Sequence, residues 1–143
     1  MSDRLYHYGI GKAVEIQSVL APTYFYYFKY KTQMALGEFI SGGRTDLGIA
    51  HGEEYFLMFP ISKRGPFNSE ESDMCLKLLE MFLKFSFNNE AQFGGLSITP
   101  VQGKTFNYMA IESPTKYGME VFDEDYYGNQ KFWDKYINYR LEN

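Results

Sequence analysis

The sequence predicts a fold of the α/β class, and three observations lead to this prediction. A helix-periodic segment at residues 12–20 is followed directly by an aromatic run at residues 23–30, and such an αβ step is typical of an open α/β sheet. A long helical segment lies in the middle of the chain. Two short strand patterns and a closing helix complete the order of elements.

The aromatic content is unusual for a chain of this size. Of the 143 residues, 45% are hydrophobic and 22% charged, as in a globular domain. Aromatic residues make up 19%, with 13 Tyr, 13 Phe and one Trp. Because aromatic side chains bury large areas, a chain this short has little other core to cover them. Either the chain is part of something larger, or a small domain encloses an aromatic-lined cavity.

Charge and motifs exclude several classes of protein. The net charge of −4 without a basic block argues against nucleic-acid binding. No run of 18 apolar residues occurs, so no membrane span is expected. Cys75 is the one cysteine, which excludes an internal disulfide and a cysteine-built metal site. No Asn-x-Ser/Thr acceptor occurs, which favours the cytoplasm, although secretion stays open, and no cofactor is expected.

The first helix is expected over residues 12–20. Ala13, Ile16 and Leu20 recur there at helical spacing and form an apolar stripe. The helix ends before Pro22, because the residue preceding a proline is displaced from the α region.

The aromatic run at residues 23–30 lacks alternation between apolar and polar positions. A β-rich run of this kind is typical of a strand buried between two layers, and this is favoured over an aromatic ligand surface. Residues 31–46, with Ser-Gly-Gly at 41–43, are expected to be irregular.

The long helix is expected to begin after Asn68 and to end near Phe87. Asn68 can cap its first turn, with Glu71 three residues later as the reciprocal partner. Its expected buried stripe consists of Cys75, Leu78, Leu79, Phe82 and Phe85.

The remainder of the chain is expected to hold a loop, two strands and a helix. The loop covers residues 88–105, the strands residues 106–112 and 119–122, and the last helix residues 130–141. Phe132 and Trp133 anchor that helix, which is also a candidate contact in a homo-oligomer.

The segment at residues 47–59 combines a histidine with two acids. His51 is followed by Gly52, Glu53 and Glu54, with apolar residues on both sides. A metal site would need a second ligand at a regular spacing, so a solvated or hydrogen-bonded acid pair is favoured. The acidic run at residues 123–125 lacks the glycine and terminal glutamate of an EF-hand loop and is interpreted as a solvated turn.

Three local motifs occur in a fixed order along the chain. Asp3 precedes a helix and the aromatic strand; residues 48–54 read Gly-Ile-Ala-His-Gly-Glu-Glu before an apolar stretch; and Phe132 is followed by Trp133 in the last helix. Together these motifs resemble the C-terminal part of the type-B carboxylesterases, the family that includes the cholinesterases. The resemblance covers nearly the whole chain as an order of elements.

This resemblance implies the C-terminal portion of an α/β-hydrolase fold, with residues 1–143 forming part of one incomplete domain. In this fold the nucleophilic serine lies upstream in a Gly-x-Ser-x-Gly turn. The resemblance identifies His51 as the catalytic histidine, which takes the serine proton and returns it to the leaving alcohol. It gives Glu54 and Asp3 supporting, structural roles near the site.

The chain departs from the family pattern because it contains no Gly-x-Ser-x-Gly. It is therefore interpreted as a C-terminal fragment of a serine carboxylesterase that acts on a small-molecule ester and is inactive as this fragment alone. The alternatives are a non-catalytic, esterase-like binding or adhesion protein and an inactive truncated product. A self-standing domain with an aromatic pocket fares worst, because so few strands cannot cover both faces of the aromatic run.

Overall fold

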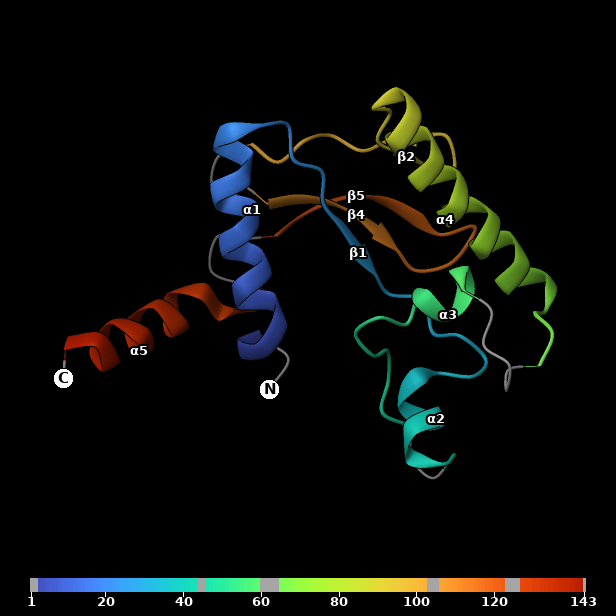
Figure 1. Cartoon of the computed structure of the whole chain (residues 1–143), viewed down its shortest axis with the longest axis horizontal. Helices are drawn as coiled ribbons and strands as arrows, with labels where there is room; N and C mark the ends of the chain where they lie inside the picture. The colour runs from blue at the N-terminus through green and yellow to red at the C-terminus, as the bar shows by residue number, and fades with distance from the viewer. Residues whose placement is uncertain (1–2, 44–45, 60–64, 103–105, 123–126, 143) are drawn as a thin grey trace. The chain divides into compact units, whose positions relative to one another are not determined.

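The computed structural model describes residues 3–43, 46–59, 65–102, 106–122 and 127–142, and shows helices together with mixed sheets (Figure 1). The chain divides into two compact units. The first unit comprises Met1–Phe25, Ile98–Tyr108 and Met119–Asn143. The second comprises Tyr26–Ser97 and Met109–Gly118.

In the first unit, the N-terminal helix begins earlier than the sequence predicts. A π-helical turn η1 (Asp3–His7) continues into α1 (Tyr8–Leu20). The predicted apolar stripe is wrong, because Ile16 and Leu20 are 66% and 75% exposed, whereas Val14 is buried. Val14 packs with Val101 and Phe106, so the partners supplied by distant segments select the buried face of α1.

Aromatic rings form much of the core of the first unit. Tyr127, in the short turn η2 (Tyr127–Asn129), is buried and stacks on Phe106 at a ring-centroid distance of 5.7 Å. It also meets Phe25 edge-on at 5.2 Å. The last helix, α5 (Gln130–Glu142), has nearly the predicted bounds, and its Asp134 accepts a hydrogen bond from the Tyr8 hydroxyl at 2.7 Å.

The three-stranded sheet has the order β1-β4-β5, with β1 (Tyr26–Phe28), β4 (Phe106–Ile111) and β5 (Tyr117–Phe122). The parallel register of β1 and β4 pairs Tyr26 with Met109 and Phe28 with Ile111, as an α/β step requires. Strands β4 and β5 confirm the two predicted strands. The aromatic strand, however, is shorter than the predicted residues 23–30, and its residues are half-buried.

Two elements lie where the sequence predicts irregular chain. Helix α2 (Leu36–Ser41) falls within residues 31–46 and ends at Gly42, which has a left-handed φ of 69°. Strands β2 (Gln92–Phe93) and β3 (Leu96–Ser97) form an antiparallel hairpin within residues 88–105. Both were missed because elements of two to six residues are too short to show a periodic pattern.

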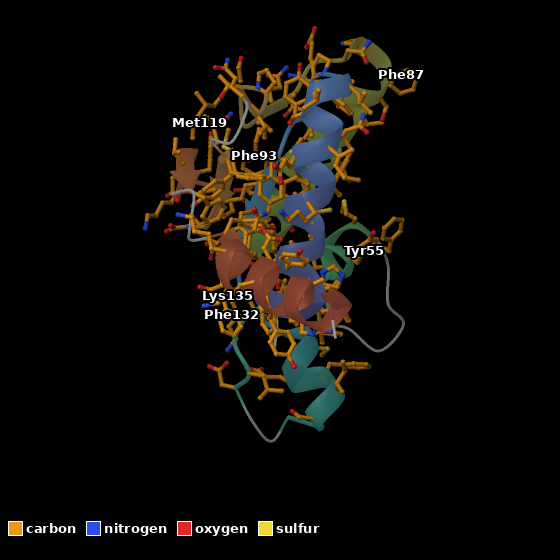
Figure 2. All side chains as sticks on the ribbon, turned by 90° about the vertical axis from the view of Figure 1, so that its left-hand side faces the viewer. Tyr55, Phe87, Phe93, Met119, Phe132 and Lys135 are labelled. Atoms are coloured by element: carbon orange, nitrogen blue, oxygen red, sulfur yellow. The ribbon has the colours of Figure 1, made fainter. Side chains whose placement is uncertain are left out.

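Helix α4 (Ser69–Asn88) confirms Asn68 as its cap, since the Asn68 side chain accepts a hydrogen bond from the Glu71 amide at 2.7 Å. The carboxylate of Glu71, predicted as the reciprocal partner, accepts a hydrogen bond from the Gln33 amide. The predicted buried stripe is correct for Leu78 alone. The buried face consists of Glu71, Met74, Leu78 and Met81. Apolar side chains also occupy other sides of α4, so periodicity does not single out one buried face. Phe87, for example, is 80% exposed and projects outward in Figure 2.

Candidate functional site

His51 lies on a tight turn that leads into the short helix α3 (Tyr55–Met58). Gly52 has a φ of 83°, a conformation that favours glycine. The turn is closed by a backbone hydrogen bond from the amide of Glu53 to the carbonyl of Ala50 at 3.2 Å. His51 itself is exposed. A turn of this kind displays an imidazole at the surface while its own backbone is held in place.

Glu53 follows two residues later and is completely buried, with 0% of its surface exposed. Its carboxylate accepts hydrogen bonds from the hydroxyl of Thr32 at 2.5 Å and from the backbone amide of Leu36 at 2.9 Å. Thr32 is itself only 2% exposed. The turn that carries His51 is therefore bonded to a buried part of the second unit.

Glu54 is half-buried and accepts a hydrogen bond from the Tyr26 hydroxyl at 3.5 Å, at the long end of the hydrogen-bond range. Burial, together with the negative charge of Glu54, raises the pKa of the Tyr26 phenol above its usual value. The phenol therefore stays protonated, as the donor of this hydrogen bond, to a more alkaline pH than an ordinary tyrosine.

The other predicted site residue, Asp3, begins η1 in the first unit. Its side chain lies outside the described part of the structure. The structure thus brings His51, Glu53 and Glu54 together in one turn, and Asp3 belongs to a different unit.

The described residues contain no group of three or more His, Cys, Asp or Glu side chains that could hold a metal ion. The acidic run at residues 123–125 lies outside these residues. Cys75 is half-buried, and its thiol donates a hydrogen bond to the carbonyl of Leu57 at 3.1 Å, as expected for a packed cysteine. In the part of the chain that the structure describes, no helix is both long and apolar enough to cross a membrane.

Sequence reasoning missed Thr32 and the hydrogen bond between Glu71 and Gln33. It gave the supporting role to Glu54, whereas Glu53 is the acid that is fully buried. Glu71 is 1% exposed and accepts a hydrogen bond from the backbone amide of Gln33 at 2.8 Å. The one available signal was the acid pair after His51. Adjacent acids carry no periodic information about which of them turns inward.

Comparison with known proteins identifies two relatives across almost the whole chain. A protein of Apis mellifera named venom carboxylesterase-6 is 28% identical over 141 residues, which cover 93% of this chain and 24% of that protein. A carboxylic ester hydrolase of Bombus ignitus is 24% identical over 140 residues, covering 94% of this chain and 25% of that protein. No family model matches the chain.

These relatives confirm the predicted resemblance to carboxylesterases. The chain spans about a quarter of the length of the curated relatives that it matches. It is therefore similar to one segment of such an enzyme.

Proposed function

We propose that this chain is the C-terminal segment of a serine carboxylic ester hydrolase of the α/β-hydrolase fold, and that His51 is its catalytic histidine. The observation that carries this proposal is the similarity to two carboxylesterases over at least 93% of the chain. The position of His51, exposed on a turn whose next acid is buried and hydrogen-bonded, supports it.

The surface of the chain supports its place within a larger domain. Among the described residues, more large apolar side chains are exposed than are buried. Single exposed apolar residues are normal, but continuous apolar surface is typical of an interface. On α4 such residues follow one another along the helix: Leu76, Leu79, Leu83 and Phe87. We propose that the preceding part of the hydrolase domain covers them.

In the proposed reaction, His51 is the general base and then the general acid. Its imidazole accepts the proton of a serine hydroxyl as the serine oxygen bonds to the ester carbonyl carbon. The proton then passes to the leaving alcohol as the ester C–O bond breaks. Water, activated by the same imidazole, releases the carboxylic acid and regenerates the serine. The serine and the triad acid belong to the remainder of the protein, while Glu54 and Asp3 support the site from this segment.

We also propose that the complete protein is secreted. The preference for the cytoplasm, drawn from the missing glycosylation acceptor and the missing disulfide, finds no support. One relative carries the name of a venom carboxylesterase, and that name favours secretion.

A fluorophosphonate probe, which reacts with activated serines, tests the proposal on the native protein. We expect a labelled species about four times heavier than this 16.7 kDa chain, with peptides of this sequence in the labelled band. A heavy species that takes no label would indicate the non-catalytic, esterase-like protein instead. A native species of only this mass would indicate the truncated product, and either result would overturn the proposal.

A further inference from the structure

Two carboxylates of the second unit are almost completely buried and hold the same short segment, residues 32–36. Glu53, with 0% exposed, accepts hydrogen bonds from the Thr32 hydroxyl and the Leu36 amide. Glu71, with 1% exposed, accepts one from the Gln33 amide. The segment is therefore hydrogen-bonded both to the turn that carries His51 and to the first turn of α4.

Because both carboxylates are buried, the loss of one of these hydrogen bonds costs much free energy. A carboxylate is transferred out of water at a large cost unless its oxygens are hydrogen-bonded. Removing one donor leaves a buried oxygen unsatisfied, which costs more than the net value of the bond itself. The turn after His51 and residues 32–36 therefore hold each other in one arrangement.

Glu53 constrains the backbone of His51 in two ways. Its amide bonds to the carbonyl of Ala50, so this bond spans His51, and its carboxylate bonds to Thr32 and Leu36. By contrast, Glu54 has the long hydrogen bond from Tyr26 at 3.5 Å. Glu53 therefore has shorter hydrogen bonds than Glu54 and is more deeply buried.

We propose that Glu53 is a positioning residue of the ester hydrolase, which aims the His51 imidazole by anchoring its turn to Thr32 and Leu36. This proposal rests on the proposed function, in which His51 is the general base. Glu53 thereby joins Glu54, to which the resemblance assigns a supporting role near the site.

The test compares variants of the complete esterase, with activity expressed per active site as titrated by a fluorophosphonate. Glu53→Gln keeps the shape and removes the charge. Thr32→Val removes the hydroxyl donor at nearly constant volume, and Thr32→Ser restores it. Glu90→Gln, at an exposed position, is the matched control.

For Glu53→Gln and Thr32→Val we expect kcat per titrated site to fall about tenfold or more, because small misplacements of a catalytic group cost up to about a hundredfold. KM should change by less than about twofold, since substrate binding is not altered. Thr32→Ser and Glu90→Gln should keep the wild-type kcat. A merely structural role would lower the number of titrated sites and the melting temperature but leave kcat per site unchanged.

An unchanged kcat per site in Thr32→Val would overturn the positioning role, as would an equal loss in Thr32→Ser. The comparison of Thr32→Val with Thr32→Ser tests the positioning role even when Glu53→Gln does not fold. His51→Ala separates the two proposals. Retained activity in His51→Ala refutes the proposed function, whereas lost activity there with unaffected Glu53 and Thr32 variants refutes the positioning role alone.

Discussion

His51 and Glu53 lie two residues apart in opposite surroundings. The histidine is exposed, while the carboxylate is fully buried among donors from residues 32–36. The proposed function requires both properties at this place, because a general base must reach the nucleophile and must also be held in a defined direction. The sequence marked the histidine and both acids. It could not assign the inward direction to Glu53, because that depends on the dihedral angles of the turn and on a donor at Thr32.

At this scale the proposed function predicts that His51→Ala, in the complete protein, lowers kcat for a soluble ester by about 10⁴-fold or more, since the proposed serine nucleophile would lose its base. Steady-state hydrolysis of a chromogenic ester measures the effect. His7→Gln is the control, because His7 lies in η1 of the first unit and has no proposed role in the reaction. A loss of less than about tenfold in His51→Ala would contradict the assignment.

In helix α4, a short sequence segment determines where the helix starts, whereas packing determines which face is buried. Its start was predicted correctly because a cap depends on residues within one turn, and Asn68 does accept the Glu71 amide hydrogen. Its buried face was predicted wrongly, apart from Leu78, because apolar residues occur around the helix. The same reason explains α1, where Val14 is buried in place of Ile16.

The cap leads to a prediction at the level of the element. Asn68→Ala should lower the free energy of unfolding by about 1 kcal/mol, because the amide of Glu71 loses its partner at the start of α4. Urea denaturation of the complete protein measures the change. Asn68→Asp, which keeps an acceptor oxygen at the cap, should be near wild type, and equal losses in both variants would count against a capping role.

At the scale of the whole molecule, two units with mixed sheets leave much apolar surface exposed. The chain corresponds to about a quarter of its curated relatives in length. Both observations agree with the first of the two interpretations of the high aromatic share, in which the chain is part of something larger that covers its aromatic residues.

The isolated 143-residue chain is therefore expected to unfold without a cooperative transition and to bind the dye ANS. The reason is that its exposed apolar side chains, such as those along α4, lack the surface that covers them in a complete domain. Thermal melting followed by circular dichroism, together with ANS fluorescence, measures both properties. A sharp melting transition without dye binding would favour a self-standing domain.

The sequence by itself determined the α/β class, the cap of α4, the strands β4 and β5, the last helix and the resemblance to carboxylesterases. Each of these depends on residues that are close together in the chain or on motifs in a fixed order. Only the tertiary structure decided which faces of α1 and α4 are buried and that Glu53, rather than its neighbour, turns inward. Those choices depend on side chains supplied by distant segments, because burial is a property of the packed whole and not of a local pattern.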